Sequence, residues 1–259
     1  MSSVPTETHG LPLAPGVNTM VFFSGFPDLF NSFAKVYPAF EENFHIILCI
    51  MPDYNKKSTT NFLGPSFAAA VEDLSVKLAE PHKCGKIVLV GHDWGSYMAQ
   101  RLVAVHPELV TKLVLLDVGR TDPPRLRDAP VILTYQLYLA TVFGISRVPL
   151  LGTLVGYIMM AIFPWKLIGP CPHEYKLPTK PTDITLSMTW PYWKIWWGIL
   201  SRQKNTSPRL PKDLPVNFIY GKNKRVMFHS DKFLKHLDKT EGREHHQLDC
   251  GHWVQTQKP

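Results

Sequence analysis

Two short segments, far apart in the chain, carry the side chains best suited to chemistry. In the first, Gly91-His92-Asp93-Trp94-Gly95 follows an apolar run at residues 87–90. Such a run, rich in β-branched residues, predicts a parallel strand that is buried on both faces. A glycine on each side of Asp93 permits the sharp strand-to-helix turn that lifts a side chain clear of the sheet. The sequence therefore predicts a nucleophile elbow that presents a carboxylate.

A carboxylate nucleophile narrows the chemistry. Its attack on an ester carbonyl would give a high-energy anhydride, whereas its attack on a saturated carbon that bears an epoxide oxygen or a halide gives an alkyl ester, which water can hydrolyse. The alternative is that Asp93 only caps the helix that follows, because aspartate is a favoured N-cap residue. A cap needs neither of the flanking glycines, so the pattern favours the catalytic interpretation.

The second segment is Gly251-His252, which comes just after an expected strand at residues 243–248. Its position makes His252 the candidate general base. Six other histidines have no such placement and are expected to be structural or exposed: His82, His92, His106, His229, His245 and His246.

Gly-His-Asp-Trp-Gly resembles the elbow of the α/β-hydrolases of the epoxide hydrolase and haloalkane dehalogenase group. The resemblance runs from Thr19 to Gln257, and it implies that His252 activates the water that hydrolyses the ester. It also implies that Ser24-Gly25-Phe26-Pro27 is the oxyanion loop, in which the backbone N–H groups of Phe26 and Trp94 form the oxyanion hole. Ser24 departs from the family, which usually has histidine there to support the loop.

The third catalytic residue is less evident. The family often places an acid shortly after the strand that here ends at Tyr220-Gly221, but Lys222-Asn223-Lys224-Arg225 contains none. Asp117 is the best placed carboxylate, because it ends an expected strand at residues 112–116 and catalytic residues gather at the carboxyl edge of such sheets. Its role would be to orient His252 through Nδ1–H. The alternative is that Asp117 caps the exit of the chain into Val118-Gly119.

The elements that must position these residues alternate between strand and helix, as a doubly wound, mostly parallel sheet requires. Expected strands are residues 19–23, 44–50, 87–90, 112–116, 215–220 and 243–248; expected helices are residues 28–40, 67–80, 94–106 and 230–237. From about residue 121 to residue 207 the strand rhythm stops, which predicts a helical cap inserted between core segments 1–120 and 208–259. The resemblance implies an α/β-hydrolase fold, from which this chain is expected to depart at both ends. The space before Thr19 is short for the antiparallel strand pair that usually opens the fold, which predicts a reduced N-terminal edge, and we expect no C-terminal closing helix like the one in the relatives.

The expected cap is rich in aromatic residues, among them four tyrosines: Tyr135, Tyr138, Tyr157 and Tyr192. In an epoxide hydrolase, hydroxyls of a tyrosine pair would hydrogen-bond the departing oxygen, and Tyr192 and Tyr135 are the first candidates. The alternative is that these side chains only build the core of the cap.

Composition bounds the remaining possibilities. A chain of 259 residues, 45% apolar and 19% charged, fits one core domain with an insertion. The net charge of +7 is spread over the chain, so we expect no nucleic-acid partner. Four scattered cysteines (Cys49, Cys84, Cys171 and Cys250) suggest inert thiols in a reducing compartment and no zinc site. The mechanism that the resemblance implies needs no metal and no organic cofactor.

The N-terminus lacks the basic and apolar regions of a signal peptide, which predicts a cytoplasmic location. The apolar stretch at residues 148–163 is interrupted by Pro149, Gly152 and Gly156 and is shorter than the roughly 20 residues that span a bilayer. The sequence leaves one alternative: the cap could contact a membrane surface, so that the protein is membrane-associated without spanning the bilayer.

The expected function is hydrolysis of a small apolar epoxide to a diol. A haloalkane dehalogenase is the first alternative, because Trp94 Nε1–H and a cap tryptophan could hold halide, although many dehalogenases have asparagine where this chain has Phe26. A catalytically silent binding protein on the same fold is the alternative from another class.

Overall fold

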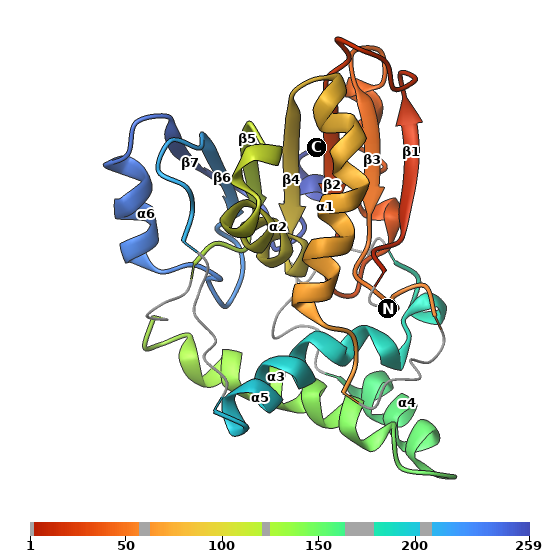
Figure 1. Cartoon of the computed structure of the whole chain (residues 1–259). Helices are drawn as coiled ribbons and strands as arrows, with labels where there is room; N and C mark the ends of the chain where they lie inside the picture. The colour runs from red at the N-terminus through yellow and green to blue at the C-terminus, as the bar shows by residue number, and fades with distance from the viewer. Residues whose placement is uncertain (1–2, 57–62, 121–124, 164–178, 203–208) are drawn as a thin grey trace.

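The protein is described by a computed structural model that covers residues 3–56, 63–120, 125–163, 179–202 and 209–259. A seven-stranded sheet has the order β1-β3-β2-β4-β5-β6-β7 (Figure 1). Its strands are β1 (Thr6–Gly10), β2 (Thr19–Phe23), β3 (His45–Cys49), β4 (Ile87–His92), β5 (Lys112–Leu116), β6 (Val216–Gly221) and β7 (Arg243–Leu248). Strands β2 to β7 pair in parallel, and β1 pairs antiparallel with β3. The predicted α/β class and strand positions are confirmed.

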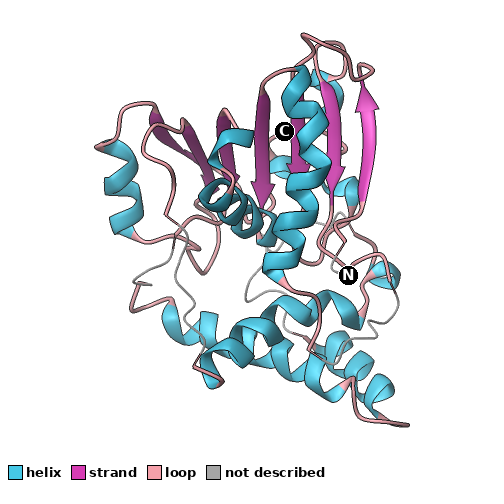
Figure 2. Ribbon diagram, in the orientation of Figure 1, coloured by secondary structure: helices cyan, strands magenta, loops and turns pink. Residues whose placement is uncertain are grey.

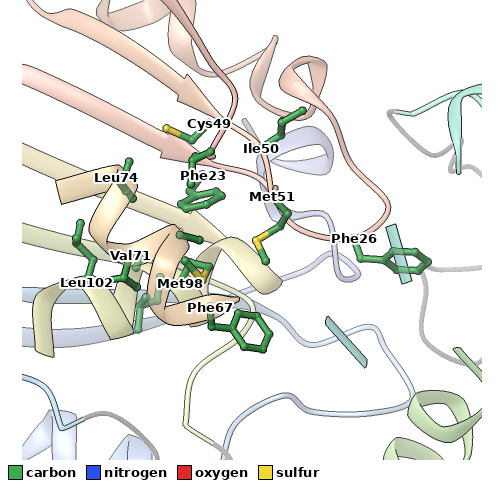
Figure 3. Close-up of a cluster of buried hydrophobic side chains, with 14 of the residues drawn as sticks. Phe23, Phe26, Cys49, Ile50, Met51, Phe67, Val71, Leu74, Met98 and Leu102 are labelled. Atoms are coloured by element: carbon green, nitrogen blue, oxygen red, sulfur yellow. The ribbon is translucent and has the colours of Figure 1, made fainter. Parts of the chain in front are cut away.

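Helices α1 (Phe67–Cys84) and α2 (Trp94–Val105) cover one face of the sheet (Figures 1 and 2). Apolar residues of α1 that are three or four positions apart, such as Val71, Leu74 and Leu78, are buried against the sheet. Figure 3 shows Val71 and Leu74 beside Met98 and Leu102 of α2 in this buried cluster. This packing fixes the elbow between β4 and α2.

The prediction of one helix over residues 28–40 is wrong. The structure has two short 3-10 helices instead, Phe30–Phe33 and Tyr37–Phe40. Pro38 lacks the N–H that an α-helix would use and clashes with the preceding turn. Ser24 and Ser32 also bond locally: Ser24 Oγ donates to the Leu29 carbonyl (3.1 Å) and Ser32 Oγ to the Asp28 carboxylate (3.2 Å).

The two edges of the sheet differ from each other. The reduced N-terminal edge consists of β1, a single antiparallel strand. At the other edge, α6 (Asp231–Asp238) packs against β7. After the His252 loop, the four-residue helix α7 (Val254–Gln257) contacts the first 3-10 helix.

Three cap-like helices lie at the carboxyl ends of the parallel strands (Figure 1): α3 (Ala129–Ile145), α4 (Gly152–Ile162) and α5 (Trp190–Leu200). Trp190 anchors α5 to the core, since its Nε1–H donates to the Pro52 carbonyl at 2.8 Å. Residues 121–124, 164–178 and 203–208 lie outside the described part of the chain. The two expected ends of the cap, near residues 121 and 207, are therefore not placed, and neither are Trp165 and Cys171. Among the described helices, none is long and apolar enough to cross a bilayer.

Candidate active site

The elbow forms where β4 meets α2. Asp93 has φ 52° and ψ −121°, a conformation that most residues avoid, and it lifts the carboxylate out of the sheet. Gly95 is required by close packing, because a Cβ there would lie 1.9 Å from the Phe23 carbonyl oxygen. Ser96 supports the turn from within, where its Oγ donates to the Gly91 carbonyl at 2.6 Å. The local sequence thus explains why the carboxylate stands clear of the sheet.

The Asp93 carboxylate faces the backbone N–H groups that were predicted to form the oxyanion hole. The Phe26 N–H donates to Asp93 Oδ2 at 2.7 Å, and the Trp94 N–H also bonds this carboxylate. Burial raises the pKa of Asp93, although His252, His92 and the two N–H groups oppose the shift. The geometry therefore brings together the candidate nucleophile and the two N–H groups that could hold negative charge on its carboxyl group.

His252 lies between the two predicted carboxylates. Its Nε2 is 3.7 Å from Asp93 Oδ1, and its Nδ1 is 2.5 Å from Asp117 Oδ2. Asp117 is fully buried and His252 is 4% exposed. Asp93, His252 and Asp117 follow three different strands and lie in this order in space. This is the order that a nucleophile, a general base and an orienting acid require.

Sequence reasoning missed Lys224, which lies in the segment where an acid was sought. Its Nζ donates to Asp117 Oδ1, which also accepts from the Gly221 N–H at 3.0 Å. Only 1% of the Lys224 side chain is exposed. Burial raises the pKa of Asp117, but the charges of Lys224 and His252 outweigh burial and hold this pKa below its usual range. Asp117 is therefore ionised and shared between a lysine and the histidine.

His92 and Asp28 form a second buried pair behind His252. His92 Nδ1 is 3.6 Å from Asp28 Oδ2, and the His92 ring lies 4.6 Å from the His252 ring. Burial opposes protonation of His92, but Asp28, Asp93 and Asp117 outweigh it and raise the pKa of His92. Asp28 also accepts from Trp253 Nε1–H at 2.8 Å, so it ties the Phe26 loop to the His252 loop. The position of His92 next to the nucleophile was the one sequence signal for this pair.

The four candidate tyrosines do not share one environment. Tyr135 and Tyr192 are 6% and 3% exposed, and their rings lie 6.0 Å apart. The Tyr192 ring packs 5.1 Å from that of Trp94. Burial and, as the next largest cause, the charge of Asp93 raise the pKa of Tyr192. Tyr138 instead donates its hydroxyl to the Met159 carbonyl at 2.8 Å, and Tyr157 is 41% exposed. The structure brings Tyr135 and Tyr192 towards Asp93, but not Tyr138 or Tyr157.

Tyr54, which follows β3, was also missed. It is 1% exposed, and its hydroxyl has no hydrogen-bond partner among the described residues. Burial and the charges of Asp93 and Asp28 raise its pKa, so this hydroxyl lies within electrostatic reach of the nucleophile.

The part of the chain that the structure describes contains no group of three or more metal-binding side chains. Cys49, Cys84 and Cys250 are free thiols. Burial raises the pKa of Cys49 to about 12 and that of Cys250 to about 11, which disfavours reactive thiolates there.

Comparison with known proteins places this geometry in a family. Residues 18–259 match the model of the alpha/beta hydrolase fold. Mouse epoxide hydrolase 4 is 23% identical over 106 residues, a match that covers 39% of this chain and only 28% of the mouse protein.

Solved structures share the fold at low identity. Bacillus megaterium epoxide hydrolase is 16% identical, with a TM-score of 0.64 over 97% of this chain and 91% of that one. A haloalkane dehalogenase variant from Bradyrhizobium elkanii is 16% identical, with a TM-score of 0.66 over 99% of this chain and 88% of that one. A marine microorganism esterase also has this fold, so the fold alone does not select the chemistry. The family match over residues 18–259 and the seven-stranded sheet lead to one conclusion: the chain belongs to the alpha/beta hydrolase fold family.

Proposed function

We propose that this hydrolase opens a small apolar epoxide to a diol by way of an alkyl ester on Asp93. One observation carries the proposal: the elbow holds a carboxylate, with His252 Nε2 3.7 Å away and Asp117 behind the histidine. The homology to epoxide hydrolases supports the same chemistry.

In the first step, a carboxylate oxygen of Asp93 attacks an epoxide carbon, and the bond from that carbon to the epoxide oxygen breaks. The oxygen takes the electron pair and a proton from Tyr135 or Tyr192, the two buried tyrosines near Asp93. Burial raises the pKa of both hydroxyls, so each is protonated and able to donate at neutral pH.

In the second step, His252 removes a proton from water, which attacks the carbonyl carbon of the Asp93 ester. The oxyanion that forms is held by the Phe26 and Trp94 N–H groups, which already contact the Asp93 carboxylate. The tetrahedral intermediate then expels the alkoxide, which takes the proton held by His252 and leaves as the diol. The proton left on the Asp93 carboxyl group returns to the tyrosinate, which restores the starting state. Asp117 holds the Nδ1–H tautomer of His252 and stabilises its protonated form.

A haloalkane dehalogenase is the second candidate, because the same nucleophile can displace halide and the fold is shared. The two buried tyrosines beside Asp93 favour the epoxide, since a departing oxygen needs a proton and a halide does not. Assays of one purified sample with epoxide, haloalkane and ester substrates distinguish the activities. Diol formation supports the proposal, and halide release without diol formation supports the dehalogenase.

The covalent step is tested by a single turnover in heavy-oxygen water. Because water attacks the ester carbonyl, we expect the label in the Asp93 carboxylate and not in the diol of the first turnover. Asp93→Asn should abolish turnover with the fold intact. Asp53→Asn is the matched control: Asp53 also follows a strand with positive φ (63°), but its carboxylate pairs with Lys56. Label found only in the diol contradicts the scheme, and absence of turnover on every substrate supports a binding protein.

A further inference from the structure

Helix α4 is apolar on every side, although it lies on the surface of the cap. Its sequence, Gly-Thr-Leu-Val-Gly-Tyr-Ile-Met-Met-Ala-Ile, has no charged residue. The inward face consists of Gly152, Gly156 and Met160, which are buried. A Cβ on Gly156 would lie 3.0 Å from Leu186, so this face already packs closely against the cap.

The outward face of α4 has large aliphatic side chains in water. This face and the segment just before the helix together form an outer face. Its exposed members, with the fraction exposed, are Val148 (56%), Leu150 (99%) and Leu151 (66%) before α4 and Leu154 (59%), Val155 (39%), Ile158 (52%) and Ile162 (70%) on it. Soluble proteins rarely gather so many exposed aliphatic side chains on one short segment. A helix that is apolar all round is normally buried on all sides, and the fold buries only one side of α4.

Several features identify what could cover this outer face. The 11 residues of α4 reach ~16 Å, about half the thickness of a bilayer core, so α4 could lie in a membrane surface but not cross the membrane. Interfaces between proteins favour aromatic and arginine side chains with hydrogen bonds, whereas this face is aliphatic. Aliphatic side chains without polar partners suit hydrocarbon instead.

The charge distribution favours anionic lipid. Between Ala129 and Phe163 the chain contains no acidic residue and one cation, Arg147, which immediately precedes the outer face. The whole chain carries a net charge of +7. Tyr157, 41% exposed on α4, has the apolar ring and polar tip that suit the boundary between lipid and water. In Figure 1, α4 lies in the cap, on the side of the molecule away from the body of the sheet.

We propose that the outer face of α4 binds the surface of an anionic lipid bilayer, inserting its aliphatic side chains among the lipid chains while the sheet domain stays in water. The docked cap would lie between the lipid and the carboxyl ends of the strands (Figure 1). Asp93 follows one of these ends, that of β4. Such a position suits an apolar substrate that dissolves in membranes. The binding itself does not depend on the proposed reaction.

The test is cosedimentation of the full chain with phosphatidylcholine vesicles, with and without phosphatidylserine. Leu151→Gln/Leu154→Gln/Ile158→Gln changes the outer face. Val76→Gln/Val105→Gln is the matched control, because Val76 (75% exposed) and Val105 (54%) are exposed aliphatic residues of α1 and α2 in the core. Thermal unfolding of each variant checks that the fold is kept.

We expect the unchanged chain and the control variant to bind the anionic vesicles, and binding to weaken without phosphatidylserine. The outer-face variant should bind at least roughly tenfold less, because each buried leucine-sized side chain contributes to partitioning. The proposal is overturned if the unchanged chain stays in the supernatant, or if both variants bind equally. It is also overturned if the unchanged chain is a dimer without lipid and the outer-face variant a monomer, since a second copy then covers this face. None of these readouts needs catalysis, so they stand apart from the test of Asp93.

Discussion

Asp117 and Lys224 show how one residue can change the electrostatics of a catalytic group. In the proposed ester intermediate Asp93 carries no charge. The nearest charged groups on the other side of His252 are then the Asp117 carboxylate and the Lys224 ammonium, whose opposite charges compensate each other. His92 with Asp28 faces His252 from the other side, and Arg125, His229 and Cys250 lie within electrostatic reach of Lys224. Lys224 therefore acts as the counterion of the carboxylate that orients His252.

Lys224→Met should shift the pH profile of ester hydrolysis, so that the reaction is lost at a higher pH than in the unchanged chain. Removal of the cation leaves Asp117 as an uncompensated anion, which favours the protonated imidazole and so leaves less neutral base at a given pH. We expect the single-turnover profile of ester hydrolysis to move to higher pH, with ester formation little changed. Lys224→Arg keeps the charge and should retain the original profile. An identical profile for Lys224→Met contradicts the role of counterion.

The tyrosine pair gives a second prediction about single side chains. Tyr192→Phe and Tyr135→Phe should each reduce kcat/KM for an epoxide by roughly 10²-fold, which is typical for loss of one donor to a developing oxyanion. Tyr157→Phe is the control, because Tyr157 is 41% exposed on α4. Full activity of both Tyr192→Phe and Tyr135→Phe refutes the assignment. A fall in melting temperature at unchanged rate would mean that these hydroxyls only stabilise the cap.

At the scale of elements, the six parallel strands were predictable, whereas β1 and part of the connections were not. Strands such as Thr19–Phe23 and Lys112–Leu116 are apolar runs that a parallel sheet buries, and this pattern is local in sequence. The segment after Pro27 has the content of apolar residues that is typical of an amphipathic helix. Pro38 and side chains that hydrogen-bond locally divide it instead into two short 3-10 helices. β1 was not predicted as a strand, because its five residues are mostly exposed and lack an apolar run.

The same distinction holds for the site. Asp93 and His252 were recognisable from their neighbours in sequence. Lys224 and Asp28 were not, because each acts through a residue more than 60 positions away. From sequence alone, a lysine in a loop is expected to be exposed, because lysine is rarely buried without a charged partner. Only the structure shows that Lys224 pairs with a buried carboxylate.

The elbow depends on the contact of α2 with β2, which Gly95→Ala tests. The added Cβ would meet the Phe23 carbonyl oxygen at 1.9 Å, and backbone atoms of a central strand cannot move aside easily. We expect a loss of about 1–3 kcal/mol or more in the free energy of unfolding by urea, together with a misplaced nucleophile. Gly144→Ala in α3 is the control: its Cβ would meet the movable Trp193 side chain at 2.9 Å. Equal losses in both variants would argue against a special constraint at the elbow.

At the scale of the whole molecule, the two faces of the sheet are covered unequally. Helices α1 and α2 bury one face, whereas a groove of about 420 Å³ remains over the other, lined in part by Val88, Val114 and Ile219. Parallel strands are normally covered on both faces. The stability of the sheet therefore depends strongly on the packed face and on the buried groups at the strand ends.

One of these buried groups should make the whole fold sensitive to acid. His229 is 1% exposed, and neither ring nitrogen has a hydrogen-bond partner among the described residues. Burial, with Lys224 and Arg125 nearby, lowers the pKa of His229 from its ordinary value to about 3. In the unfolded chain this histidine takes up a proton near pH 6.5, whereas in the folded chain it does so only near pH 3.

Between these two pH values the unfolded state binds more protons than the folded state, so the free energy of unfolding must fall as the pH falls. For His229 alone the loss amounts to about 2 kcal/mol between pH 7 and pH 5. His229→Phe should remove this part of the pH dependence, since the rings of Phe218 and Tyr220 already surround the site at 5.1 and 4.4 Å. His246→Gln, at a half-exposed position of β7, should leave the slope unchanged. Urea unfolding at several pH values measures the slopes, and equal slopes for His229→Phe and the unchanged chain would show that this buried imidazole does not control acid stability.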